Sequence, residues 1–590
     1  MRDRLRPGWS VLMPTLFLVS ACVGAEPAIT LTVQCDKIYL RPGETQFATI
    51  TAQNSTRADA NLKLKVTLLW DVNSSRVLGE PALKVPASGS AKTTLVLPAG
   101  PELFGYEVRA EGTGVAPASG FFGVHHNFWQ VTLQGSVPGG HLHISESPKI
   151  TEAERERAMS ARRTSLCNHV EFFAWAPDDF STLVPQTEYW FAGQTGYPGS
   201  RLSLHTMVDY YHSVGATTSI YAKGQLGGPA AFEFFRRKPL WGVHPYHGQW
   251  NLLDLKLFVV KTPLFEGRNT WPRAMCDFGR ADIADWHIQQ LRQASQEYHF
   301  DGVRYDDHLA VNWAGEASPK VTARNMEQTI KQLRVALPYY GFGYNWIASW
   351  MIAEWQKNGN KPPWPDWPIA AASGAQMMDE EVGQIYGSSR PKTGLPWADY
   401  IQRLKTDRAM TESLGGKVFI MFNSGLPPTD SSYRNALVFA LRLHHTNYDG
   451  NAPLQFGRFA TRFSTLIWND NPIDIPADQV QITAARPLWG AEFAYRYQLA
   501  PGRGRAVVHL FNPPAGPKMG AEPRAAFPDP IANVKVKLSL PQGWQATSGT
   551  VIDAGTLQTK PVPVSGGAVD VAVPSLAIWS VLVVDCKTAE

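Results

Sequence analysis

Hydrophobic and polar residues alternate one by one near both ends of the chain, whereas the middle follows another pattern. The alternation runs through residues 29–33 and 62–68 near the amino end, and through 505–511, 534–538 and 579–584 near the carboxyl end. A period of two is typical of strands that bury one face. We therefore expect an immunoglobulin-like β-sandwich at the amino end and a second β-sandwich at the carboxyl end.

From about residue 160 to 455, short apolar runs alternate with stretches of helical period, which is the pattern of β/α units. The segment 456–468 is amphipathic and is expected to close the barrel that these units form. The expected fold class is therefore multidomain α/β plus β, with a central (β/α)8 TIM-type barrel between the two sandwiches. Six of its strands are predicted at residues 170–175, 218–221, 302–306, 341–345, 375–378 and 417–423.

The chain has 590 residues, more than one core usually supports, so several domains are expected. The predicted division is a signal peptide at 1–25, the first sandwich at 26–130, the barrel at 131–475 and the second sandwich at 476–590.

The first residues are typical of an export signal. Three arginines precede an apolar stretch at residues 9–19 that is too short to span a bilayer. Residues 19–22 resemble a bacterial lipobox, in which Cys22 would be acylated, and residues 23–25 offer an alternative small-residue cleavage site. We expect an exported bacterial protein, whether an outer-membrane lipoprotein, periplasmic or secreted. Any membrane contact would be made through acyl chains on Cys22.

The overall composition is that of an ordinary globular protein. Hydrophobic residues make up 44% of the chain and charged residues 18%, and the formal net charge is only +4. No basic run stands out, so nucleic acid is not an expected partner. The chain also has 20 Trp, 19 Tyr and 27 Phe, and flat rings of this kind stack on the apolar faces of sugars, although most would be needed for cores.

Four further cysteines, Cys35, Cys167, Cys276 and Cys586, are scattered along the chain. Their spacing matches neither a metal site nor a dense disulfide framework, so isolated buried thiols are expected. We expect no metal and no cofactor.

Residues 300–308 form an apolar run that delivers carboxylates where a strand should end, as barrel enzymes do at their active sites. Asp306 would end the strand, and Arg304 would project to the same side because side chains repeat with a period of two. That guanidinium would lower the pKa of Asp306 and keep it ionised as a nucleophile. The alternative is a structural Asp–Arg pair. Asp307 is expected to face away or to bind a sugar hydroxyl.

A second acidic cluster, residues 379–381, lies about 75 residues further on. Glycosidases use one carboxylate to attack or stabilise an oxocarbenium-like centre and one protonated carboxyl to release the leaving sugar. Glu381 suits the second role because apolar neighbours would raise its pKa by desolvation. Spacing alone leaves Asp379 and Glu380 open as alternatives.

The order of these motifs resembles that of family 66 glycoside hydrolases, the dextranases and cycloisomaltooligosaccharide glucanotransferases. Residues 301–306 are similar to the family block Asp-Gly-Trp-His-Ile-Asp, whose last residue is the nucleophile, which implies Asp306. Glu381 and Val382 resemble the start of the Glu-Val-Trp acid/base block, which favours Glu381 over its neighbours. Residues 171–175 are similar to the first-strand block Gln-Phe-Tyr-Asp-Trp. The arrangement of sandwich, barrel and sandwich also agrees with the family.

The sequence departs from the family at two positions: Ala174 stands where the first strand has Asp, and Asp307 stands where the family has Gln. These departures leave specificity for α-1,6-glucan open. Residues 301–306 also resemble the nucleophile block of α-amylases, and α-galactosidase-type barrels carry their acids on similar strands. All of these relatives act on α-linked sugars with retention.

Further substrate-binding residues are expected where the barrel strands end. They are Trp175, Tyr221, Arg304, Asp307, Asn345 and Asn423. Packing is the alternative role for Trp175, Tyr221 and Asn345.

The sequence therefore predicts an exported retaining glycoside hydrolase that acts on an α-linked glucan or a related oligosaccharide. Asp306 would form the glycosyl-enzyme intermediate and Glu381 would be the acid/base. Hydrolysis and transglycosylation need the same catalytic residues, so both stay open, as does the oligomeric state. Two rival interpretations are a non-catalytic surface glycan-binding lipoprotein and an adhesion protein built from the sandwiches.

Overall fold

The structure is a computed structural model of the whole chain. It describes residues 28–97, 104–126, 134–138, 160, 163–173, 176, 184–185, 187–191, 198–223, 225–227, 237, 242–245, 273–276, 281–306, 331–338, 340–346, 377–380, 396–414, 417–422, 428–447, 456–469, 471–519, 527–564 and 566–589.

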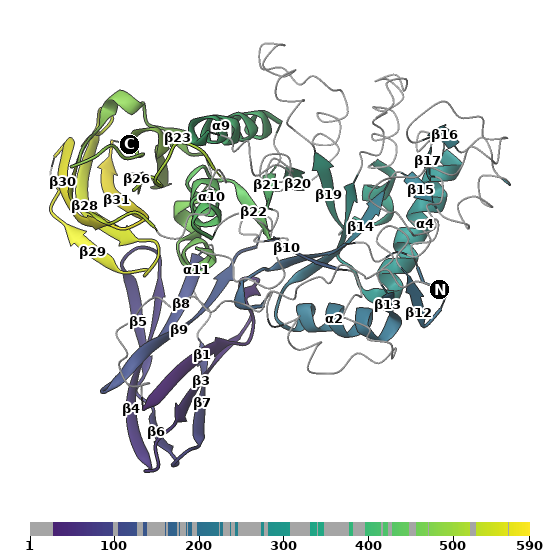
Figure 1. Cartoon of the computed structure of the whole chain (residues 1–590), viewed down its shortest axis with the longest axis horizontal. Helices are drawn as coiled ribbons and strands as arrows, with labels where there is room; N and C mark the ends of the chain where they lie inside the picture. Colours follow the sequence, from purple (N-terminus) through teal and green to yellow (C-terminus); the bar gives the residue numbers. More distant parts are fainter. Residues whose placement is uncertain are drawn as a thin grey trace, which may run out of the picture.

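The amino-terminal region is a sandwich of two mainly antiparallel sheets, drawn in purple to blue in Figure 1. Residues along its strands are buried and exposed in turn, and the inward residues of both sheets form one apolar core. The first sheet has the order β1 (Ile29–Cys35), β3 (Gln46–Asn54), β7 (Ser90–Leu97). The second has the order β2 (Tyr39–Leu40), β9 (Val115–Val124), β8 (Phe104–Gly112), β4 (Ala60–Trp70), β5 (Ser74–Gly79), and β6 (Ala82–Val85) also pairs with β4.

Eight strands in the middle of the chain form a closed barrel, and every neighbouring pair in it is parallel. The six strands expected from the sequence are present, and β10 and β22 complete the circle. Around the barrel the order is β10 (Gln134–Pro138), β11 (His169–Phe173), β14 (Thr217–Lys223), β18 (Gly302–Asp306), β19 (Gly341–Trp346), β20 (Met377–Glu380), β21 (Lys417–Phe422), β22 (His444–Asn447).

Helices connect several of these strands and cover the outside of the barrel (Figure 1). In α4 the buried residues Ile283, His287, Leu291, Ala294 and Tyr298 recur every three to four positions, the spacing of a helix that buries one stripe. The connecting helices are α2 (Arg201–Ser213), α4 (Ala281–Tyr298), residues 331–336, α9 (Trp397–Leu414) and α10 (Pro428–Ala440), and α11 (Gly457–Arg462) follows the last strand.

Two small antiparallel sheets lie in the connections between barrel strands. The first pairs β12 (Tyr189–Phe191) with β13 (Pro198–Ser200), and the second has the order β15 (Gln225–Gly227), β17 (Arg273–Cys276), β16 (Gly242–Pro245).

The carboxyl-terminal region is a second two-sheet sandwich, drawn in yellow in Figure 1, with its own apolar core. Its larger sheet has the order β23 (Ile473–Asp474), β25 (Ala494–Ala500), β26 (Arg503–Phe511), β31 (Trp579–Thr588), β28 (Trp544–Asp553), β29 (Thr559–Val562). The smaller has the order β24 (Val480–Thr483), β27 (Ile531–Ser539), β30 (Ala568–Leu576).

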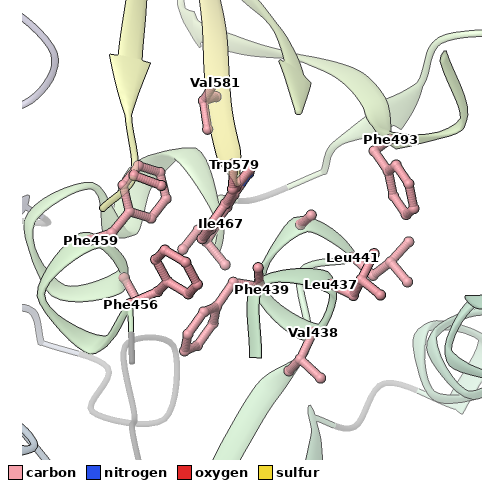
Figure 2. Packing of buried hydrophobic residues seen from close by; sticks show 14 of the residues in the cluster. Leu437, Val438, Phe439, Leu441, Phe456, Phe459, Ile467, Phe493, Trp579 and Val581 are labelled. Carbon is pink, nitrogen blue, oxygen red and sulfur yellow. The ribbon is translucent and has the colours of Figure 1, made fainter. Parts of the chain in front are cut away.

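A shared apolar core joins the barrel to the carboxyl-terminal sandwich (Figure 2). Trp579 of β31 is 1% exposed, and its ring lies 4.5 Å from that of Phe459 on α11 and 5.2 Å from that of Phe456. Phe439 and Leu441, from α10 and the turn after it, belong to the same cluster. Edge-to-face and tilted rings of this kind add to the stabilisation that burial alone provides. The helix α11 therefore docks the sandwich rather than closing the barrel; closure comes from the pairing of β10 with β22.

The amino-terminal sandwich reaches the same region through Val72 and Phe121, which belong to the shared cluster, and through polar contacts. Arg505 on β26 is 2% exposed, and its guanidinium donates to both carboxylate oxygens of Asp71 at 2.6 and 3.1 Å and to Asp585 at 2.6 Å. Asp71 lies in the turn between β4 and β5, where its φ of 48° is left-handed. Arg505 therefore ties the tip of the first sandwich to the last one.

Residues 444–447 form the last strand of the barrel. His444 and His445 begin β22, which pairs in parallel with β21 on one side and β10 on the other. The helix α10 ends four residues earlier, and Arg442, with a φ of 61°, turns the chain into the strand. His444 is buried with its ring stacked 4.7 Å from that of Trp468.

Three cysteines, Cys35, Cys167 and Cys586, are free and buried, as expected. Burial raises the pKa of the Cys35 thiol to about 12, and burial, with the nearby charge of Asp585, does the same for Cys586. Among the described residues, no helix is long and apolar enough to cross a membrane.

Substitution of Gly105 tests the contact between the amino-terminal sandwich and α11. A Cβ at Gly105 on β8 would lie 1.5 Å from the carbonyl oxygen of Thr461, so Gly105→Ala must push the two elements apart. We expect a loss of about 2 kcal/mol or more in the free energy of unfolding, measured by thermal or denaturant unfolding.

The matched control is Gly123→Ala. Gly123 lies directly opposite Gly105 on β9, and a Cβ there meets no atom within 4 Å. Equal stability losses in the two variants would contradict the role assigned to Gly105.

Candidate active site

The carboxyl ends of all eight barrel strands lie at one end of the barrel because all neighbouring strands are parallel. Asp306 is the last residue of β18 and pairs with Lys223 of β14. One step earlier Tyr305 pairs with Tyr344, so Asp306 lies level with Asn345 of β19, which in turn pairs with Asp379 of β20. The strands thus bring the backbones of Asp306, Asn345 and Asp379 to the same level.

Alternate positions along the strands face opposite sides of the barrel wall. Phe172 of β11 packs its ring against Tyr211 of α2, and the hydroxyl of Tyr305 lies 2.7 Å from Nε2 of His287 on α4. These residues face the helices outside. The residues between them, such as Arg304, therefore face the interior. Asp306 follows Arg304 by two positions along β18.

The interior holds a buried layer of charged and aromatic side chains below the carboxyl end. Arg304 is 1% exposed and its Nη1 lies 3.7 Å from Oε1 of Glu171, which is fully buried. The Arg304 guanidinium also lies over the ring of Tyr221, 5.4 Å from its centroid. Glu171, Tyr221 and Arg304 come from the three consecutive barrel strands β11, β14 and β18. An aromatic face and a carboxylate thus surround the guanidinium.

A histidine forms the next layer down. His169 is buried, and both of its ring nitrogens contact hydroxyl groups. Its Nδ1 lies 2.8 Å from Oγ1 of Thr217, and its Nε2 lies 3.1 Å from Oγ of Ser219. Burial lowers the pKa of His169 to about 4, although the charge of Asp301 opposes this. His169 is therefore neutral at physiological pH and links β11 to β14.

Asp301 stands at the opposite end of β18 from Asp306 and has a structural role. Its Oδ2 accepts hydrogen bonds at 2.8 Å from the backbone N–H of Thr218 and at 2.8 Å from Nε2 of His212. Next to it, a Cβ on Gly302 would lie 2.8 Å from the carbonyl oxygen of Gly341, so only glycine lets β18 and β19 approach this closely. The Asp-Gly start of the motif thus fixes the base of the barrel.

The sequence-predicted residues fall into three groups. Tyr221 and Arg304 lie together in the buried layer, and both are almost fully inaccessible. Asp306 and Asn345 are placed by their backbones. Asp306 is the last residue of β18, and Asn345 lies in β19. The remaining residues, Trp175, Asp307, Glu381 and Asn423, lie outside the described part of the chain. Glu381 directly follows Glu380, the last residue of β20.

Sequence reasoning did not predict that Glu171 pairs with Arg304. A signal was present: the middle positions of the strands 169–173 and 302–306 carry charges of opposite sign between apolar or aromatic neighbours. Charges inside a barrel wall need partners, so two such strands predict an ion pair.

No group of three or more metal-ligating side chains that could hold an ion gathers among the residues that the structure describes.

No family model matches the sequence, and no curated protein matches it either. The structure is similar to a crystal structure of a Paenibacillus sp. cycloisomaltooligosaccharide glucanotransferase complexed with cycloisomaltoheptaose. The TM-score is 0.72 at 12% sequence identity, over 94% of this chain and all of the other. A maltogenic α-amylase from Thermotoga neapolitana reaches a TM-score of 0.45 at 10% identity, over 78% of this chain and 99% of its own. The resemblance to family 66 expected from the motifs is thus found in the fold, and it is distant.

The contact between His212 and Asp301 predicts a pH-dependent contribution to stability. Burial disfavours the charged ring, but the hydrogen bond and the negative charge of Asp301 outweigh it and raise the pKa of His212 above 6.5. A raised pKa stabilises the fold below the unfolded pKa, and this stabilisation is lost as the pH rises through the folded value. The loss in the free energy of unfolding caused by His212→Gln should therefore be larger at pH 5.5 than at pH 8.5. The difference should be small, on the order of 0.5 kcal/mol, because both groups are partly exposed.

Thermal unfolding of the wild type and the variant across this range measures the difference. His205→Gln, on the same helix, is the control: burial, the largest influence, lowers the pKa of His205, so its effect should change with pH in the opposite direction. A pH-independent effect of His212→Gln would contradict the proposed charge contact.

Proposed function

We propose that the protein is an exported retaining glycoside hydrolase that acts on α-linked glucans or related oligosaccharides and is able to transfer glycosyl groups to sugar acceptors. We further propose that its closed barrel is a complete (β/α)8 barrel. The fold shared with a cycloisomaltooligosaccharide glucanotransferase supports a glucan-active hydrolase or transferase, and the closed order of eight parallel strands supports the barrel.

One observation carries the proposal: acidic residues end two strands that lie on either side of the same neighbour. Asp306 ends β18, and the cluster 379–381 spans the end of β20. Both strands pair with β19, so their backbones are about 10 Å apart, twice the usual strand spacing. Carboxyl groups that lean inward from such positions can approach the roughly 5 to 5.5 Å that a retaining mechanism needs.

The register also bears on which acid in the cluster is the acid/base. Arg304 pairs with Gly343, which pairs with Met377, so the backbone of Met377 lies level with that of Arg304. Counting on in steps of two gives Asp379, whereas Glu380 takes the alternate position. This register favours Asp379 over Glu380, and the family resemblance favours Glu381.

In the proposed reaction the Asp306 carboxylate attacks the anomeric carbon while Glu381 protonates the leaving oxygen. The glycosidic bond breaks and a glycosyl ester forms at position 306. Glu381 then removes a proton from water or from an acceptor hydroxyl, whose oxygen displaces the ester and restores Asp306. Both displacements invert the anomeric centre, so the product keeps the α configuration.

The purified protein, incubated with α-glucans, α-galactosides and bacterial exopolysaccharides, should release or transfer sugars with the α configuration, which NMR of the first product shows. Asp306→Ala should abolish turnover while leaving the fold intact. Glu381→Ala should lower turnover of natural substrates by about 100-fold to 10,000-fold. With an aryl α-glycoside, whose nitrophenolate leaves without a proton, the variant should keep kcat/KM, which reports the first step, while the second step, which needs the base, becomes slow.

Asp379→Ala and Glu380→Ala are the matched controls, and a spared aryl substrate in either of these instead would reassign the acid/base. β-configured products would overturn retention. Binding without release across the whole panel would favour the non-catalytic glycan-binding alternative.

Export and lipid anchoring rest on the lipobox-like residues 19–22. We expect radiolabelled palmitate to be incorporated into the full chain in a bacterial host and to be absent from Cys22→Ser. Unlabelled wild-type protein recovered from the periplasm or medium would instead support cleavage at the small residues just beyond Cys22.

A further inference from the structure

The buried ion pair of Glu171 and Arg304 is more than packing requires. Both side chains are at most 1% exposed, and two apolar residues would fill the same space without the cost of removing two charges from water. A barrel that retains such a pair gains little stability from it. The pair therefore calls for a role that depends on its charge and geometry.

Its place in the barrel suggests that role. Arg304 lies one inward step below Asp306 on the same strand, a rise of about 7 Å between the two backbones. Glu171 pairs in register with Ser219, two positions before Tyr221, and Tyr221 pairs with Arg304, so Glu171 approaches the guanidinium from lower in the barrel. The Tyr221 ring covers one face of the guanidinium. A guanidinium carries five N–H donors in a planar fork, so Arg304 can make contacts besides these two.

We propose that Glu171 is a positioning residue for the reaction: it orients the Arg304 guanidinium so that this group holds the carboxylate of Asp306 in line with the anomeric carbon. The inference rests on the proposed function, which it deepens. A guanidinium suits the task because its planar fork can bind one carboxylate below and a second above in fixed relative orientation.

The kinetic consequence follows from the geometry. Glu171 lies below the substrate level and would not contact sugar, so its loss should leave KM nearly unchanged. Orientation of the nucleophile matters in the transition state, where a misplacement of about 1 Å costs roughly 100-fold in rate. A change in kcat with little change in KM is thus expected of a residue acting in this way.

The experiment compares Glu171→Gln with the double variant Glu171→Gln, Arg304→Met. The single variant keeps the shape of the side chain and removes its charge, so we expect kcat to fall by about 10-fold to 100-fold with KM within about 3-fold of wild type. The double variant buries no unpaired charge and should unfold near the wild-type temperature. Its kcat should nevertheless stay at least as low as that of the single variant, because the oriented guanidinium is gone.

A purely structural ion pair predicts the reverse for the double variant, namely that restored charge balance restores turnover. That recovery would overturn the proposal, as would a single variant with wild-type kcat. If Glu171→Gln fails to fold, Glu171→Asp takes its place, because it keeps the buried charges paired while shifting the guanidinium; a wild-type kcat in that variant would overturn the proposal. Glu297→Gln is the control: Glu297 pairs with Arg201 on the helices outside the barrel, and its loss should leave kcat unchanged.

The proposed function can fail separately. A wild-type protein that neither transfers nor hydrolyses any sugar overturns both the proposed function and the positioning role. An active wild type whose kcat is unchanged by Glu171→Gln overturns the positioning role alone.

Discussion

The architecture depends on the hydrogen bonds between β10 and β22, which close eight parallel strands into a circle. Gln134 pairs with Thr446 and Gly135 with Asn447, joining segments more than 300 residues apart. Without this closure the sheet would have two open edges and its strand ends would fan out. With it, all carboxyl ends face a common centre, and Asp306 and the end of β20 come to lie on either side of β19. The buried layer of Glu171, Tyr221 and Arg304 fills the interior directly beneath.

Much of this fold could be predicted from the sequence because its signals are local. Period-two strands identified both sandwiches, and apolar runs such as 302–306 and 417–422 identified the barrel strands. The strands β10 and β22 were missed for a physical reason. Gln-Gly-Ser-Val-Pro and His-His-Thr-Asn have neither an apolar run nor alternation, and pairing on both sides makes them strands. Tertiary context outweighed local preference there.

The site likewise combines features that local sequence predicts with features that depend on tertiary pairing. The position of Asp306 at a strand end followed from the motif alone. The partner of Arg304 did not, because Glu171 lies 133 positions earlier and only the barrel order brings the two strands within reach. The roles within residues 301–306 also separate only in three dimensions: Asp301 and Gly302 secure the base of the barrel, and Asp306 stands at the other end.

The tie between Asp71 and Arg505 has a consequence for biogenesis. The two residues are 434 positions apart, so at about 5 to 20 residues per second the ribosome needs roughly 20 to 90 s to supply the arginine after the aspartate. During that interval the turn between β4 and β5 carries a carboxylate with no cation from β26 beside it. The first sandwich has an apolar core of its own, which equips it to fold before the last one arrives. The ion pair of Arg505 and Asp71 then joins two domains that are synthesised at different times.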